Sequence, residues 1–467
     1  MNKVLSVLLL SLFITTISFG QVKNKIQIDS ITYAQYTSKQ WKDLVKTGKK
    51  AQKTDSSFYY LKLRMGVAYY ELGNYRKAIK YFEQTLKETP KDAFIEEFLY
   101  YSYLFSGRKA DAVKFSKNMN KDVKKREKIH KPRLVQGVQA EGGYFMNKDY
   151  NNLVSVDNDL LEDNDESYIY AEQLVPKDYK YANFGLTHSI NNSITFFHSY
   201  TNLQIQKLQQ YHTYEYENDE YGYIKDSVKT INDTIVTTVQ HQYYASVNIQ
   251  LKHGLSIIPA FHFLNTTNTN YTFNYDTVTH GQYFTNGKTY LNSYLFYLGI
   301  VKECRLFTLG VSASYSNLNN KKQIQPGVSL IYYPFGNTNL YTGSYVYYQM
   351  NKMPGKRGGK EENIVFSQKI GVKLFKVWLE GTAMIGNLSE FNDAGGFVVY
   401  NNTDKIQQKF EGVLIIPLFK GKADISLRYQ NVSFKSNIIR MKNKEDAYNK
   451  EFNYINNLFI GGLSWRF

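Results

Sequence analysis

The sequence predicts an α+β multidomain protein, with N-terminal α-helical repeats followed by a transmembrane antiparallel β-barrel of about 14 strands. Three observations support this prediction. Residues 454–467 alternate between apolar and small or charged side chains, which is the pattern of a strand between two different solvents. The chain contains 42 Tyr and 29 Phe, which suits the aromatic girdles of a membrane barrel. Residues 59–92 have the spacing of a helical hairpin repeat.

The N-terminus has the features of a secretory signal peptide. Lys3 precedes an apolar run over 4–13, and Ser18 and Gly20 occupy the small-residue positions before an expected cleavage after Gly20. No cysteine lies near this point, so we expect no lipoprotein anchor, and the single Cys304 cannot form an internal disulfide. Residues 21–467 lack an apolar run of about 20 residues, so any membrane crossing must use strands.

The net charge of +16 is concentrated near the N-terminus. Residues 21–133 contain 26 Lys or Arg and 12 Asp or Glu, whereas residues 134–467 contain 30 and 29. An exported basic domain is not expected to meet nucleic acid in the periplasm. The candidate partners of a basic patch there are anionic lipid, cell-wall polymer or an acidic protein, and the alternative is a solvated Lys-rich helical surface. Residues 121–133 are predicted to be a basic linker.

The window 59–92 resembles a tetratricopeptide repeat. The matching positions are Gly66, Tyr69, Gly73, Tyr75, Ala78, Phe82 and Pro90. The small residues allow close helix crossing, the aromatic rings fill the space between the helices, and Pro90 ends the second helix. The flanking windows match less well, so we expect two repeats and a capping unit over 21–120. The resemblance implies a partner-binding groove near Tyr69, Tyr75 and Tyr103, and the alternative role is a spacer.

From residue 134 onward, fourteen amphipathic segments follow one another and form the predicted barrel, 134–467. They lie at approximately 134–146, 178–190, 193–206, 239–252, 254–265, 291–301, 304–316, 321–333, 338–350, 363–374, 376–388, 406–419, 422–434 and 454–467. Short turns alternate with longer connections, as in outer-membrane barrels. An even strand count places both barrel ends on the periplasmic side. The long connections, which include 147–177, 207–238, 266–290, 389–405 and 435–453, are therefore predicted to be extracellular.

The alternation within the segments predicts which side chains face lipid. In 239–251 the odd positions are mostly apolar and the even positions carry amides and hydroxyls, and 307–316 repeats the pattern with Ser, Thr and Gly inside. Later segments place charges on the interior face, because charges on the lipid face are penalised. These predicted lumen-lining residues are Lys369, Lys373, Glu380, Lys409, Glu411, Asp424, Arg428 and Arg466. They form either a salt-bridged interior or the lining of a conducting path.

Motifs of catalysis are missing from the sequence. The eight His have no paired metal spacing, and no nucleophile arrangement or phosphate-binding glycine loop occurs. We therefore predict no enzyme and no cofactor. Residues 156–166 are rich in Asp and Glu but lack the glycine of an EF-hand, which leaves a looser calcium site or a hydrated acidic loop. The tyrosines of 211–225 either stack on sugars or extend the strands beyond the membrane.

The aromatic C-terminus, Phe467, resembles the closing strand of bacterial outer-membrane barrels. The whole layout resembles YaiO-like outer-membrane proteins and exopolysaccharide-export barrels. This resemblance implies a Gram-negative outer membrane, a repeat domain in the periplasm, and contact with outer-membrane lipid. Two functions remain open. The barrel is a conduit or export component for a polysaccharide or polar solute, with repeats that recruit a periplasmic protein partner, or it is a closed anchor for a periplasmic complex.

Overall fold

The computed structural model describes residues 25–53, 57–129, 133–154, 170–218, 224–275, 282–352, 359–402, 404–441 and 447–467. The predicted signal peptide and the acidic segment 156–166 lie outside the described residues. The chain divides into two compact units. One contains residues up to Ser106 together with 119–127, and the other contains 107–118 together with 128–467. Each unit is described separately.

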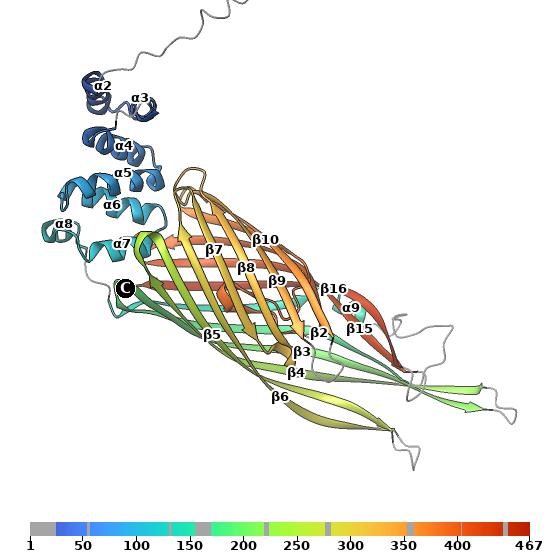
Figure 1. Cartoon of the computed structure of the whole chain (residues 1–467). Coiled ribbons are helices and arrows are strands. Elements are labelled where there is room, and N and C mark those ends of the chain that lie inside the picture. The colour runs from blue at the N-terminus through green and yellow to red at the C-terminus, as the bar shows by residue number, and fades with distance from the viewer. Residues whose placement is uncertain are drawn as a thin grey trace, which may run out of the picture. The chain divides into compact units, whose positions relative to one another are not determined.

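The first unit is a stack of helices (Figure 1). It contains α2 (Lys25–Thr37), α3 (Trp41–Lys53), α4 (Tyr59–Glu71), α5 (Tyr75–Glu88), α6 (Ala93–Phe105) and α8 (Lys121–Arg126). Side-chain caps define two of the starts: Asn74 accepts from Lys77 N–H at 3.2 Å, and Asp92 accepts from the N–H groups of α6. Helix α8 occupies the first half of the segment predicted as a linker.

The predicted repeat is the pair α4 and α5. Ala78 and Phe82 of α5 are fully buried, and a Cβ added to Gly66 would lie 2.8 Å from the Phe82 ring. The absence of a side chain at Gly66 therefore lets the ring pack against the α4 backbone. The Tyr69 ring stacks on Tyr81 at 5.5 Å. The packing roles predicted for these small and aromatic positions are confirmed.

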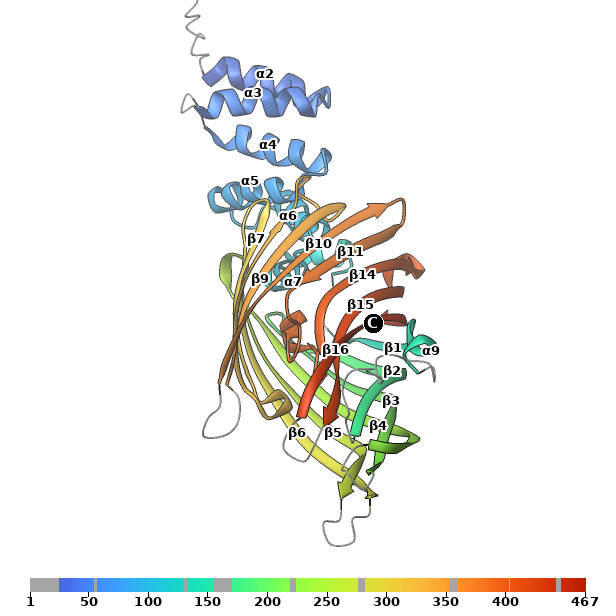
Figure 2. The ribbon, with the colours of Figure 1, turned by 90° about the vertical axis from the view of Figure 1, so that its right-hand side faces the viewer.

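The second unit is a closed antiparallel barrel of fourteen strands (Figures 1 and 2). Its strands are β1 (Val135–Asn147), β2 (Tyr170–Asn191), β3 (Ile194–Asn218), β4 (Ile224–Gln250), β5 (Leu255–Tyr275), β6 (Gln282–Glu303), β7 (Phe307–Ser316), β8 (Lys322–Tyr332), β9 (Leu340–Lys352), β10 (Lys360–Leu374), β11 (Val377–Ile385), β14 (Lys405–Leu418), β15 (Ala423–Met441) and β16 (Ala447–Arg466). Strand β16 pairs with β1 and closes the cylinder. Each of the fourteen predicted segments corresponds to one of these strands.

The strands extend further than the sequence pattern predicts. Most of 207–238 was expected to be a loop, but β3 continues to Asn218 and β4 begins at Ile224. The predicted loops 266–290 and 435–453 are likewise mostly strand, in β5–β6 and β15–β16. Figure 1 shows these hairpins projecting beyond the rest of the barrel. The prediction failed because both faces of these extensions carry polar residues, so apolar alternation cannot reveal them.

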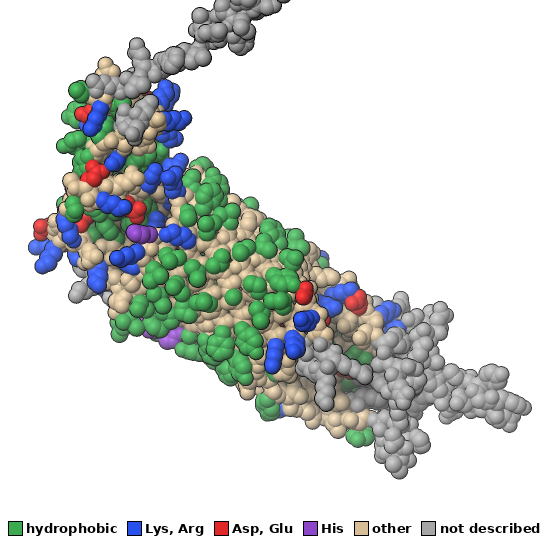
Figure 3. Space-filling view, viewed as in Figure 1, with side chains coloured by type: hydrophobic (Ala, Val, Ile, Leu, Met, Phe, Trp, Pro, Cys, Tyr) green, Lys and Arg blue, Asp and Glu red, His purple; other side chains and the backbone are tan. Residues whose placement is uncertain are grey.

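The outer and inner faces follow the predicted alternation. On β4 Tyr243 is exposed, whereas Gln240 is only 3% exposed. On β7 Val311 is 54% exposed and Ser316 is fully buried. Apolar side chains cover much of the barrel wall visible in Figure 3. The outer face is therefore compatible with hydrocarbon, while hydroxyls and amides lie inside.

One short helix of the repeat region packs with the barrel. Helix α7 (Lys109–Ser116) belongs to the barrel unit. Asn192, in the turn between β2 and β3, donates to the Val113 carbonyl at 2.8 Å, and Lys114 donates to the Gln250 carbonyl at 2.7 Å. The Gln250 amide donates to the Asp111 carboxylate at 2.8 Å. These bonds attach α7 to two of the short turns of the barrel.

Candidate functional site

The lumen contains the connection between β11 and β14, here called the inward loop (residues 386–402). It was predicted to be extracellular, and this prediction is wrong, because its residues are hydrogen-bonded to the interior faces of strands around the barrel. The loop carries the short strands β12 (Asn392–Asp393) and β13 (Val398–Val399), which pair with each other. Glycines with positive φ form its bends, at Gly386, Gly395 and Gly396.

Glycine is required at the first of these bends. Gly386 has a φ of 130°, and a Cβ there would lie 2.5 Å from the Ile364 carbonyl oxygen. At the other end of the loop, Glu390 N–H donates to the Tyr400 carbonyl at 3.0 Å, and Tyr400 N–H donates to the Phe391 carbonyl at 2.9 Å. The loop is therefore a folded hairpin with its own backbone hydrogen bonds.

Side chains from β4 and β5 hold the glycine bend of the loop. The Tyr244 hydroxyl donates to the Gly395 carbonyl at 3.1 Å. His262, which is 1% exposed, lies with its Nδ1 2.8 Å from the Gly396 carbonyl oxygen. Because a carbonyl only accepts hydrogen bonds, His262 must carry a proton on Nδ1.

Side chains from β7, β8 and β9 hold the opposite part of the loop. Asn392 donates to the Ser314 hydroxyl at 2.9 Å, and Gln325 donates to the Asn392 carbonyl at 2.8 Å. Gln349 donates to the Ser389 carbonyl at 2.9 Å. Side chains of five strands between β4 and β9 are thus hydrogen-bonded to the inward loop. The loop is also bonded to β14, because Leu388 N–H donates to the Ile406 carbonyl at 2.8 Å and Lys409 donates to the Tyr400 hydroxyl at 2.9 Å.

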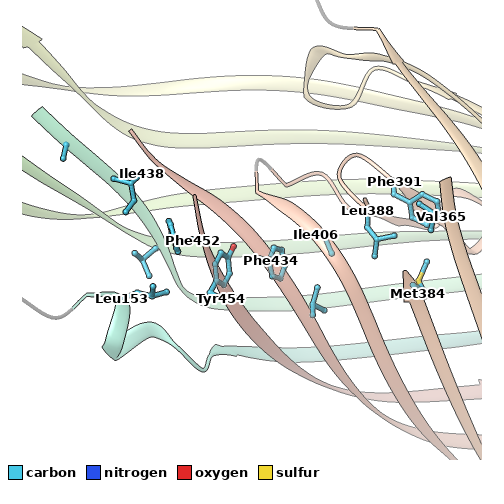
Figure 4. Packing of buried hydrophobic residues seen from close by; sticks show 13 residues of the cluster. Leu153, Val365, Met384, Leu388, Phe391, Ile406, Phe434, Ile438, Phe452 and Tyr454 are labelled. Atoms are coloured by element: carbon cyan, nitrogen blue, oxygen red, sulfur yellow. The ribbon is translucent and has the colours of Figure 1, made fainter. Parts of the chain in front are cut away.

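The loop also takes part in a hydrophobic core inside the barrel (Figure 4). Leu388 and Phe391 are fully buried, and they lie near Val365 of β10 and Met384 of β11 in Figure 4. The buried members of this cluster are Leu153, Ala171, Val175, Val365, Met384, Leu388, Phe391, Ile406, Val432, Phe434, Ile438, Phe452 and Tyr454. Burying a side chain such as Leu or Phe contributes about 1.5–3 kcal/mol, so the inward position of the loop is strongly stabilised.

Cavities lie on both sides of the inward loop. The inner cavity, about 390 Å³, lies toward the short turns and is lined by Val301, Thr308, Thr382, Asp393 and Arg428 among others. The outer cavity, about 480 Å³, lies toward the long hairpins and includes Thr266, Asn268 and Asn402. Both volumes fall in the range of about 300–1,000 Å³ that small-molecule sites occupy.

The eight charged residues predicted to line the lumen all lie on the interior-facing side of their strands, and most are paired. Lys369 Nζ lies 3.2 Å from the Glu380 carboxylate, and Lys409 Nζ lies 3.0 Å from Glu411. The ammonium group of Lys373 lies 4.6 Å from the centre of the Trp378 ring.

The other three charges form two pairs closer to the closing strands. Arg466 forms an ion pair with Asp424, and Arg428 lies 3.8 Å from Glu141. This arrangement corresponds to the salt-bridged interior rather than to a row of unpaired charges.

The three tyrosines predicted to line a groove on the repeats differ in their exposure to solvent. Tyr69 and Tyr103 are 5% and 7% exposed, and the Tyr103 hydroxyl donates to Glu83 at 2.6 Å. Burial and the neighbouring Tyr81 raise the pKa of Tyr69 to about 12. These two rings therefore belong to the core. Tyr75 is more accessible to solvent. The centre of its ring lies 5.1 Å from the centre of the Phe105 ring, and Phe105 is 44% exposed.

Cys304, the single cysteine of the chain, is partly buried. Among the described residues, no group of three His, Cys, Asp or Glu is arranged to hold a metal ion. None of the helices in the described part of the chain is long and apolar enough to cross a membrane.

Comparison with known proteins supports the helical repeat. A tetratricopeptide-repeat family model matches residues 60–92, which confirms the predicted repeat. No curated protein sequence matches this chain. Among solved structures, the P. putida toluene transporter TodX has a TM-score of 0.43 at 7% identity, covering 71% of this chain and 90% of TodX. A Pseudomonas aeruginosa FadL homologue has a TM-score of 0.41 at 7% identity, with coverages of 71% and 90%.

A bacterial polysaccharide outer-membrane secretin matches with a TM-score of 0.30 at 9% identity, over 72% of this chain and 99% of that protein. These similarities concern barrel architecture alone.

The inward loop was missed although the sequence carries a signal for it. Residues 386–400 read GNLSEFNDAGGFVVY, with five bulky apolar side chains, at Leu388, Phe391, Phe397, Val398 and Val399. Exposing so many apolar side chains to water is unfavourable for a surface connection, whereas a loop that folds into a lumen can bury them. The adjacent glycine pair indicates a tight bend between the two apolar parts.

Proposed function

We propose that this protein is a gated outer-membrane conduit for a small polar solute, with the inward loop as its gate. The supporting observation is the position of the loop between two cavities of ligand size. The loop is held by hydrogen bonds and apolar contacts. These contacts can break and form again without any covalent bond being broken. A polymer would need the whole loop displaced at once, so a small solute fits the site better than a polysaccharide strand.

The barrel wall supports a location in the outer membrane. A closed barrel leaves no unpaired strand edge, and its outer face carries exposed apolar side chains such as Phe296, Val311 and Leu463. Barrels of this type lie in the bacterial outer membrane, and an even strand count puts both ends of the barrel on one side, which in this proposal is the periplasmic side. In this proposal the repeats lie in the periplasm and recruit a protein partner there.

A closed anchor for a periplasmic complex is the second candidate. The dense packing of Leu388 and Phe391 favours it, because these side chains must leave a buried core before the lumen opens. The two candidates differ in whether the loop has to move.

A disulfide that locks the loop distinguishes them. Cysteines at Asn392 and Ser314, whose side chains are hydrogen-bonded, would join the loop to β7 in a Cys304→Ser background. We expect wild-type protein in planar bilayers to show brief conductance steps, the oxidised lock to abolish them, and a reductant to restore them. A matched disulfide between Ser316 and Gln323, which joins β7 to β8 without touching the loop, should leave conductance unchanged.

Silent wild-type protein would contradict the conduit and support the anchor. Equal conductance of the locked and unlocked protein would show that the inward loop is not the gate.

A further inference from the structure

The inner cavity contains polar groups that the fold does not use. Thr382 on β11 and Arg428 on β15 both line it. Within the described part of the chain, the Thr382 hydroxyl and the Arg428 Nε are buried and have no hydrogen-bond partner. Buried polar atoms normally find partners, because leaving one unpaired costs about 1–3 kcal/mol. Both side chains therefore keep hydrogen-bonding capacity that the fold leaves unused beside a cavity of ligand size.

The charges around this cavity nearly cancel. Lys409 is paired with Glu411, and Lys369 with Glu380. The guanidinium of Arg428 has one long contact, 3.8 Å to Glu141. A site with balanced charge gives no net attraction to an ion, and a cationic or anionic ligand would leave one sign unneutralised. A neutral ligand with many hydrogen-bonding groups fits this environment.

The remaining wall combines hydroxyls with aromatic rings. Ser312, Ser329 and Ser367 supply small hydroxyls, while Tyr345 and Tyr347 supply ring faces. Aromatic surface with a few placed polar groups is the usual composition of small-molecule sites. A sugar matches both components, because its C–H face packs against rings and its hydroxyls both donate and accept hydrogen bonds.

We propose that the inner cavity is a binding site for an uncharged sugar of mono- to disaccharide size. Arg428 donates to sugar oxygens, and Thr382 donates to or accepts from a sugar hydroxyl. The loop residue Asp393, which also lines the cavity, accepts from a further hydroxyl and so connects ligand binding to the gate. This proposal rests on the proposed function, since the solute reaches the cavity through the conduit.

Equilibrium binding to the full-length protein in detergent tests the site without requiring conduction. Titration calorimetry with glucose, N-acetylglucosamine and maltose is expected to give saturable binding of at least one sugar. Thr382→Val keeps the side-chain shape and removes a hydroxyl that has no partner in the described structure. It should weaken that binding about 3- to 10-fold, the value of one hydrogen bond, without lowering the thermal stability of the barrel. Arg428→Met should weaken it further.

Ser293→Ala is the matched control. The Ser293 hydroxyl on β6 is also buried without a partner in the described chain, and Ser293 is not part of the inner cavity wall. Its removal should leave sugar affinity unchanged. Absence of saturable binding by all three sugars would overturn the proposal, as would tighter binding of glutamate or arginine than of any sugar. Equal affinity of Thr382→Val and wild type would overturn it too. Sugar binding in a protein that never conducts would instead leave this site intact and refute the conduit.

Discussion

At the scale of single residues, glycines allow side chains of neighbouring helices to pack against the helix backbone. Gly66 lies against the ring of Phe82, and Gly48 lies against the thioether of Met65. A Cβ at Gly66 would meet a rigid ring at 2.8 Å, and a Cβ at Gly48 would meet the flexible end of a methionine at 2.3 Å. Both partners are fully buried, and the nominal overlap is greater at Gly48. The unbranched methionine can adopt another rotamer, whereas the Phe82 ring is rigid.

We therefore expect Gly66→Ala to destabilise the repeats by about 1–3 kcal/mol and Gly48→Ala to cost less. Circular dichroism at a helical wavelength would follow the melting of the helices in the full-length protein. A larger loss of melting temperature for Gly48→Ala than for Gly66→Ala would contradict this account of the packing.

At the scale of elements, the closing strand β16 combines a lipid-facing side with the final strand pairing. Trp465 lies on the outer face beside Phe419, with ring centres 5.7 Å apart, and Phe467 N–H donates to the Gln136 carbonyl at 3.0 Å. A charge on the lipid face of a barrel is destabilising by an amount that depends on depth. Trp465→Asp should therefore lower the amount of heat-modifiable barrel in membranes.

Asn453→Asp provides the control, because Asn453 is exposed on the same strand beyond the apolar belt and pairs with Lys435. It should assemble at wild-type levels. Normal assembly of Trp465→Asp, or an equal defect in both variants, would show that the outer position of Trp465 does not govern assembly.

The same strand shows what sequence patterns can and cannot predict. Period-two alternation identified β16 and β7 because lipid on one side and a polar lumen on the other impose opposite side-chain types. The ends of β3 and β4 were missed because water lies on both sides of the extensions. The inward loop was missed because a connection is expected on the surface, and only its apolar content argues otherwise. The unused groups on Thr382 and Arg428 depend on distances between strands, which no local pattern contains.

At the scale of the whole molecule, the chain consists of two units, each with its own packing. The barrel is closed by its own strand pairing, from β1 to β16, and carries helix α7 with it. The repeat unit builds its own core around Leu61, Phe82 and Leu99. Each unit therefore contains the contacts it needs to fold.

Removal of residues 21–106 should leave an assembled barrel, because this deletion spares α7 and its hydrogen bonds to the barrel turns. The shortened protein should conduct in bilayers like the full chain but fail to support function in the cell, since it cannot recruit a periplasmic protein. Capture of that protein by the full chain should weaken with salt, because exposed charges are screened beyond about 10 Å at 0.1 M ionic strength. If the shortened protein replaces the full chain in the cell, the repeats act only as a spacer and the recruiting role is wrong.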